Sequence, residues 1–230
     1  ARQYPPLVML NENALNNDRV ATQMLSPTLG QHKNVYKVSE KPIDALRGIR
    51  GQIAQVRVWN ADADIFLRDV KGKWDVIIAD FPDPSTPDLA KLYSAEFYAL
   101  VKASLNPGGI FALQAGSPYT NRSAFWSIAH TIEAVGFSVK SLHAHVPTFG
   151  EWGWHVAKIG ALPIFSAALP DNLKYLDKQT LLAASIFGRP LNSTNMVRHI
   201  STRVDPWVMR LYQMGEQLEG HRVFTGRAER

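Results

Sequence analysis

Short apolar runs alternate with longer amphipathic segments along the middle of the chain. The clearest run is Trp74–Asp80, in which apolar residues are nearly continuous between Gly72 and Pro82. Such a run is typical of a strand that is buried on both faces of a parallel sheet. Strands are predicted at residues 54–59, 74–80, 110–113, 138–146 and 152–159, and helices at residues 63–69, 90–105, 121–135, 178–187 and 206–218.

The alternation of strands and helices predicts an α/β fold. Strands that are joined by helices form βαβ units, so we expect a parallel sheet with helices on both faces. Residues 138–146 and 152–159 have no helix between them, and we expect them to form an antiparallel hairpin at one edge of the sheet. Residues 7–10 resemble the end of a helix that runs into a polar turn at residues 11–18.

The composition limits the chemistry that the chain can carry out. Of its 230 residues 46% are apolar, which is enough for a sizeable core, and none is cysteine. The absence of cysteine excludes disulfides, a thiolate nucleophile and Cys-ligated zinc or iron–sulfur sites. The net charge of +5 comes from interspersed charges of both signs, as in ordinary soluble domains. The apolar, charge-free stretch at residues 159–170 is too short to span a membrane.

Polar residues follow directly after several predicted strands. In an open α/β sheet, ligands bind outside the carboxyl ends of the strands. Asp62 and Gln114 each follow one strand, and a third strand is followed by Asp80 and Asp83 in a loop that prolines stiffen. Two carboxylates at one rim are suited to bind a cation and to accept a proton from it. The alternative is that such aspartates cap helices or form Asx turns.

Aromatic residues and glycines are interleaved in residues 147–154, Pro-Thr-Phe-Gly-Glu-Trp-Gly-Trp. One interpretation is a flat apolar slot for an alkyl chain or for a cationic amine, which an aromatic face attracts. The other is a hairpin that cross-strand aromatic pairs stabilise. The segment alone does not favour either interpretation.

Taken together, these segments resemble the spermidine synthase (polyamine aminopropyltransferase) family. The resemblance is carried, in order along the chain, by residues 75–84, 92–98, 105–109, 114–118 and 147–154. Each segment alone is weak, but their order and spacing match the family over residues 56–190. The Phe-Pro pair in the acidic loop and the Phe-Gly-Glu-Trp-Gly segment resemble the subgroup in which this domain follows a membrane region with several spans.

The resemblance implies a Rossmann-like methyltransferase fold and a reaction of polyamine biosynthesis. An aminopropyl group would move from decarboxylated S-adenosylmethionine to putrescine, giving spermidine and methylthioadenosine, and no metal would be needed. By the same resemblance Asp80 is the general base. Binding of the amine is assigned to Asp83, Gln114, Phe149, Glu151 and Trp152, and binding of the donor to Asp62, Ala63 and Asp80.

The resemblance also divides the chain into three parts. Residues 1–55 would hold a partial N-terminal helix and a loop inserted at residues 21–55, residues 56–190 the Rossmann-like aminopropyltransferase core, and residues 191–230 a helical segment. The glycine-rich strand–loop of the family, and the acidic residue that ends its second strand, are not found. We expect them to lie before Ala1, so that the N-terminal strands of the fold are missing and the chain is a fragment of a longer protein.

The resemblance has further implications for location and assembly. The chain would be a cytoplasmic domain, attached to the inner membrane only through a segment outside this sequence. Homodimers are common in the family and are a further expectation. Phe149 departs from the tyrosine that many members have at this position, which would remove one hydroxyl contact to the amine.

Three other functions remain compatible with the sequence. An S-adenosylmethionine-dependent methyltransferase would keep the fold, although a nucleobase substrate would favour a basic surface where this loop is acidic. A non-catalytic polyamine-binding domain would account for the absent glycine-rich loop. Arginines that recur after residue 188 could bind nucleic acid, but acidic residues are interleaved with them, so we expect no nucleic-acid partner.

Overall fold

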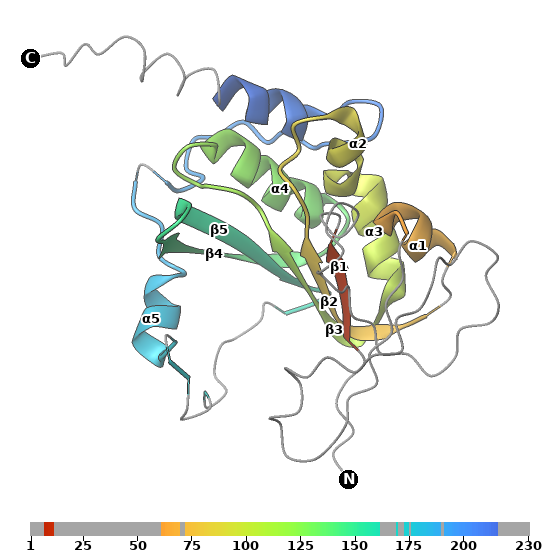
Figure 1. Cartoon of the computed structure of the whole chain (residues 1–230), viewed down its shortest axis with the longest axis horizontal. Helices are drawn as coiled ribbons and strands as arrows, with labels where there is room; N and C mark the ends of the chain where they lie inside the picture. The colour runs from red at the N-terminus through yellow and green to blue at the C-terminus, as the bar shows by residue number, and fades with distance from the viewer. Residues whose placement is uncertain are drawn as a thin grey trace, which may run out of the picture.

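Five strands form the centre of the molecule. The structure is a computed structural model that describes residues 7–11, 61–69, 72–161, 169, 173–174, 176–189 and 191–215. The strands follow the order β1-β2-β3-β5-β4 across the sheet (Figure 1). Their bounds are β1 Leu7–Asn11, β2 Trp74–Asp80, β3 Leu105–Gln114, β4 Ser138–Val146 and β5 Gly150–Lys158. β1, β2 and β3 are parallel, whereas β5 is antiparallel to both β3 and β4, which confirms the α/β fold and its antiparallel hairpin.

Residues 7–10 form a strand, so the helix end predicted there is wrong. β1 pairs in parallel with β2 along its whole length and ends with Asn11 opposite Asp80. A run of four apolar residues is compatible with a helix or with a buried strand, and the pairing with β2 decides between them. The strand predicted at residues 54–59 and the insertion expected at residues 21–55 lie outside the described residues.

Some of the helices are shorter than the sequence predicts. Their bounds are α1 Ala63–Asp69, α2 Pro87–Ala90, the 3-10 helix η3 Lys91–Tyr93, α3 Ala95–Ser104, α4 Arg122–Ala134 and α5 Lys178–Ala183. The single helix predicted at residues 90–105 is broken at Ser94, whose backbone is extended. The Ser94 hydroxyl accepts a hydrogen bond from the N–H of Phe97 (3.2 Å) and so caps the start of α3.

The C-terminal helices also differ from the prediction in length. α5 ends at Ala183 rather than at residue 187. Of the helix predicted at residues 206–218, residues 207–215 are helical, and the remainder lies outside the described residues. α1 and α4 occupy the segments that the sequence predicts for them.

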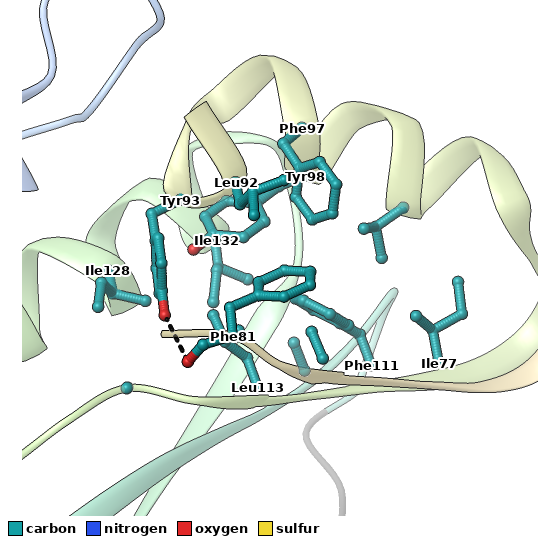
Figure 2. Close-up of a cluster of buried hydrophobic side chains, with 14 of the residues drawn as sticks. Ile77, Phe81, Leu92, Tyr93, Phe97, Tyr98, Phe111, Leu113, Ile128 and Ile132 are labelled. Atoms are coloured by element: carbon teal, nitrogen blue, oxygen red, sulfur yellow. Dashed lines mark hydrogen bonds between the residues drawn. The ribbon is translucent and has the colours of Figure 1, made fainter. Parts of the chain in front are cut away.

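The helices α1, α3 and α4 pack along one face of the sheet (Figure 1). Alternate residues of β2 and β3, among them Ile77, Phe111 and Leu113, point toward these helices and are fully buried. Figure 2 shows these side chains in one buried cluster with Phe97 and Ile128. Side chains on the opposite face are half-buried. Helices over that opposite face, expected from the sequence, stay a prediction.

Aromatic rings run in a chain from the end of β2 into the core. Phe81, which follows β2, packs edge-on against Phe97 with ring centroids 5.6 Å apart. Phe97 in turn contacts Tyr98 (6.1 Å), and Tyr98 contacts Phe111 of β3 (5.8 Å). Each such pair adds about 0.5–1.5 kcal/mol to the gain from burial. Phe81 is only 2% exposed, so the loop after β2 starts from a fixed point.

A buried histidine lies in the middle of β5. The Nε2–H of His155 donates a hydrogen bond to the carbonyl of Phe125 (2.9 Å), which leaves Nδ1 to accept one from the Ser141 hydroxyl (3.0 Å). Burial lowers the pKa of His155 to about 4, although the hydrogen bond to Phe125 opposes this shift. The imidazole is therefore neutral in the folded protein near neutral pH.

Acidification is expected to destabilise the fold through His155. The unfolded chain binds a proton here below about pH 6.5, whereas the folded chain does so only near pH 4. The stability contributed by the neutral imidazole is thus complete above pH 6.5 and is lost as the pH falls toward 4. At about 1.4 kcal/mol per pH unit, the loss reaches about 3 kcal/mol.

Urea unfolding across this pH range measures the effect. The free energy of unfolding should depend less steeply on pH for His155→Gln than for the wild type. His145→Gln is a matched control at an exposed position of β4 and should keep the wild-type dependence. Equal pH dependences for His155→Gln and the wild type would contradict the assignment.

Candidate active site

The carboxyl ends of the parallel strands meet the start of β5 at one edge of the sheet. β1 ends opposite Asp80, the last residue of β2, and Gln114, the last residue of β3, pairs with β5. One loop leaves this edge after β2, at residues 81–86, and another leaves after β3, at residues 115–121. We call Asp80, Gln114 and these two loops the rim. The rim is the part of an α/β sheet where ligands bind.

Asp80 projects from the rim at the end of β2, and its side chain is exposed. The surrounding protein still desolvates the carboxyl group, and this partial burial raises the pKa of Asp80 above its ordinary value. The next residue, Phe81, is anchored in the core and fixes the backbone that carries Asp80. A carboxylate with a raised pKa is a stronger base than an ordinary aspartate, which suits Asp80 to accept a proton.

Asp83 is held by two side chains from distant parts of the chain. The Tyr212 hydroxyl donates a hydrogen bond to Asp83 Oδ2 (3.0 Å), and Nε2 of Gln114 lies 3.4 Å from Asp83 Oδ1. Gln114 is buried, its Nε2 also donates to the Phe81 carbonyl (2.6 Å), and its Oε1 accepts from the N–H of Gly116 (2.8 Å). The structure thus brings Asp83 and Gln114 together, with Gln114 joining the two loops of the rim.

Further contacts fix the backbone of the rim. The Tyr93 hydroxyl shares its single proton between the carbonyls of Pro82 (2.9 Å) and Phe81 (3.4 Å, Figure 2). Gly116 has a φ of +70° and lies against Asp83, so that a Cβ here would be 3.3 Å from Asp83 Oδ1. Only glycine meets both requirements without strain. The position of the Asp83 carboxylate is therefore fixed from several sides.

Asp62 lies at the start of α1, directly before the buried residue Ala63. Its Oδ1 accepts hydrogen bonds from the N–H groups of Asp64 (2.9 Å) and Ile65 (3.1 Å), so Asp62 caps the start of α1. Its Oδ2 accepts a hydrogen bond from the ammonium group of Lys91 (2.5 Å). Burial acts to raise the pKa of Asp62, but the bonds from Lys91 and from the two backbone N–H groups outweigh it, and the pKa lies below its ordinary value.

Phe149 and Trp152 form an aromatic pair at the tip of the β4–β5 hairpin. Their ring centroids are 5.2 Å apart, and Phe149 is 65% exposed. Backbone hydrogen bonds join Gly153 to Ala115 (3.0 Å) and to Gly116 (2.8 Å), which places this part of the hairpin beside the rim. An aromatic surface next to carboxylates is suited to a ligand with an alkyl chain and cationic ends.

Glu151 lies on the opposite face of the hairpin from Trp152, as neighbours in a strand do. It pairs with His143 of β4, whose Nε2 contacts the carbonyl of Ile186 (2.8 Å). The structure therefore does not bring Glu151 together with the aromatic pair. Instead Glu151 connects the hairpin to the chain that follows α5.

Three residues that hold the site are absent from the sequence-based assignment. Tyr93 and Lys91 lie in the segment predicted as one regular helix, where nothing in the spacing indicates contacts to loops. Tyr212 is 129 residues away from Asp83 along the chain, and no local pattern joins the two. In the described part of the chain, no group of His, Asp or Glu side chains is arranged to hold a metal ion. None of the helices described there has the length and hydropathy of a membrane span.

A solved structure shares this fold. Spermidine synthase in complex with the transition state analogue AdoDATO matches with a TM-score of 0.50 and 22% sequence identity, over 62% of this chain and 50% of that chain. At this identity the match supports the fold alone, and it confirms the Rossmann-like methyltransferase fold expected from the sequence.

Curated proteins and a family model place the chain in a family. Polyamine aminopropyltransferase 1 of Streptomyces coelicolor is 40% identical over 161 residues, which are 69% of this chain and 30% of that protein. Polyamine aminopropyltransferase of Mycobacterium tuberculosis is 47% identical over 117 residues, 50% of this chain and 22% of that protein. The chain thus spans less than a third of the length of these relatives. The family model "Spermine/spermidine synthase domain" matches residues 33–165, more than half of the chain, which therefore belongs to the spermine/spermidine synthase family.

Proposed function

We propose that the protein is a polyamine aminopropyltransferase that moves an aminopropyl group from decarboxylated S-adenosylmethionine to putrescine. The observation that carries the proposal is the pair of carboxylates at the rim. Asp80 is exposed and has a raised pKa, and three residues later Asp83 is held by Gln114 and Tyr212. One carboxylate is suited to remove a proton, and the other to bind the second ammonium group of a diamine. The names of the relatives support the same reaction.

Asp80 acts as the general base in this reaction. Near neutral pH both ends of putrescine are protonated, like a lysine side chain, and an ammonium nitrogen has no lone pair with which to attack. The Asp80 carboxylate removes one proton, and the freed nitrogen forms a bond to the carbon beside the sulfonium sulfur. The C–S bond breaks, its electron pair neutralises the sulfur, and spermidine and methylthioadenosine result. Alignment of the nitrogen and the carbon in one site supplies a large part of the rate.

Asp62 and Ala63 hold the adenine of the donor in this proposal. Asp62 has a lowered pKa and is therefore ionised, although both of its oxygens already accept hydrogen bonds from the protein. Each carboxylate oxygen has two acceptor positions, so the adenine amino group can be accepted without loss of the helix cap. Lys91 then serves to orient Asp62 rather than to bind the donor. A spermidine synthase that shares this fold has been solved in complex with the transition state analogue AdoDATO.

The aromatic pair lines the slot for the carbon chain of the amine. Phe149 and Trp152 offer apolar and π surface beside the rim, which attracts a cationic alkylamine. Gln114 supports amine binding indirectly, because its buried amide contacts Asp83 rather than facing the slot. We do not include Glu151 in the binding set, because its carboxylate faces His143 on the other side of the hairpin.

The charges around the rim favour a polyamine over a nucleic acid. The rim carries the carboxylates of Asp80 and Asp83, which would repel phosphates. Several C-terminal arginines are already paired with carboxylates. The pairs are Arg198 with Glu133, Arg203 with Asp64 and Arg210 with Asp205.

A product assay with the full-length protein tests the proposal. Decarboxylated S-adenosylmethionine and putrescine should be converted to spermidine and methylthioadenosine. S-adenosylmethionine with DNA or RNA should give no methylated product, and such a product would instead favour a methyltransferase. Putrescine binding in calorimetry without release of methylthioadenosine would favour a non-catalytic polyamine-binding domain.

A further inference from the structure

The helix at residues 207–215 contacts the rim loop at residues 81–86, which we call the acidic loop, at two points. The Tyr212 hydroxyl donates a hydrogen bond to Asp83 Oδ2 (3.0 Å), and the next residue, Gln213, donates through Nε2 to the carbonyl of Ser85 (3.1 Å). In Figure 1 this helix is drawn in dark blue beside α2, the helix that begins after the acidic loop. The C-terminal segment, expected from the sequence to be helical, is therefore in contact with the proposed amine site through Tyr212 and Gln213.

Tyr212 is one of the groups that orient the Asp83 carboxylate. Oδ2 of Asp83 is directed toward the Tyr212 hydroxyl, while Oδ1 lies near Nε2 of Gln114 and against Gly116. The Gln114 distance of 3.4 Å is long for a hydrogen bond, so the Tyr212 contact is the shorter of the two. Prolines on both sides of Asp83 limit the backbone torsions of this loop. Tyr212 restrains the side-chain torsions of Asp83.

We propose that Tyr212 is a positioning residue of the amine site, which holds Asp83 so that its carboxylate binds the distal ammonium group of the diamine. The inference rests on the proposed function and extends it to the C-terminal helix. A carboxylate that is already oriented loses less conformational entropy when it binds a cation, so amine affinity depends on this restraint. The proton transfer at Asp80 and the binding of the donor do not depend on it.

Steady-state kinetics of the full-length protein test the inference through Tyr212→Phe. The substitution removes only the hydroxyl and keeps the ring. We expect the KM for putrescine to rise roughly ten- to a hundredfold, as for the loss of a hydrogen bond to a charged group, with kcat and the KM for the donor nearly unchanged. Tyr98→Phe is the matched control, because the Tyr98 hydroxyl is buried and has no hydrogen-bond partner among the described residues. It should leave both KM values unchanged.

A double-mutant cycle separates a positioning role from a merely structural one. If Tyr212 acts through Asp83, then Tyr212→Phe should raise the KM for putrescine in the wild type but not in the Asp83→Ala background. The inference would be overturned if Tyr212→Phe raised the KM for putrescine equally in both backgrounds. It would also be overturned if Tyr212→Phe left that KM unchanged while the wild type is active. Either result would leave the proposed function intact. Absence of aminopropyl transfer by the wild type would overturn the proposed function and this inference with it. Thermal unfolding of each variant shows whether the fold is retained.

Discussion

Asp80→Asn is expected to lower the turnover of the full-length protein by roughly 10²–10⁴-fold, the usual contribution of a general base. Asparagine has nearly the same shape as aspartate, but its amide cannot take a proton from the attacking ammonium group. The fold should be unaffected, because the Asp80 side chain is exposed and the backbone beside it is anchored by Phe81. Release of methylthioadenosine at saturating donor and amine measures the effect.

A control on the same strand makes this result specific. Asp75 lies at the other end of β2, where its carboxylate accepts a hydrogen bond from Asn106 (2.8 Å). Asp75→Asn makes the same chemical change away from the rim and should leave turnover as in the wild type. Near-normal turnover of Asp80→Asn, with an unchanged thermal unfolding midpoint, would remove Asp80 from the role of base.

Asp83→Asn is expected to act on the affinity for the amine rather than on the chemical step. Removal of one partner of a hydrogen-bonded charge pair costs about 2–5 kcal/mol, so the KM for putrescine should rise by roughly 30-fold or more. Asparagine still offers an oxygen to the Tyr212 hydroxyl, which keeps the side chain in place. Separate titration of putrescine and of the donor yields the two KM values, and only that for putrescine should change strongly.

The opposite pattern would reverse the assignment of the two carboxylates. If Asp83→Asn lowered kcat and left the KM for putrescine unchanged, Asp83 rather than Asp80 would be the base. Asp69→Asn is a suitable control, because Asp69 is an exposed carboxylate at the end of α1. This variant tests whether the loss of any one negative charge weakens amine binding. We expect Asp69→Asn to have the same KM for putrescine as the wild type.

Local patterns along the sequence were sufficient to predict much of the sheet. β2 is found at the predicted residues because its apolar run is bounded by breakers and buried between β1 and β3. The β4–β5 hairpin follows from the absence of a helix between two alternating segments. The apolar run of β1 does not by itself indicate a strand, because its partner strand lies more than sixty residues further along the chain. Helical spacing on both sides of Ser94 gives no sign of the break there, which depends on a single hydroxyl cap.

Part of the candidate site can also be predicted from local sequence patterns, and part of it cannot. The positions of Asp80, Asp83 and Gln114 at the rim follow from the sequence, because strand ends meet at one edge of a parallel sheet whatever the rest of the fold. The contact of Tyr212 with Asp83 depends on the packing of a C-terminal helix against the loop at residues 81–86, which no local pattern encodes. The orientation of Glu151 follows from strand alternation once the bounds of β5 are known, and it separates this residue from Trp152.

A crystal structure of the full-length protein with methylthioadenosine and putrescine bound tests the assignment of Asp80 most directly. We expect one putrescine nitrogen about 2.6–3.2 Å from an Asp80 carboxylate oxygen, the range for proton transfer. The other nitrogen should contact Asp83, which Tyr212 holds. Putrescine bound away from the rim, or with neither nitrogen in contact with Asp80, would contradict the proposed mechanism.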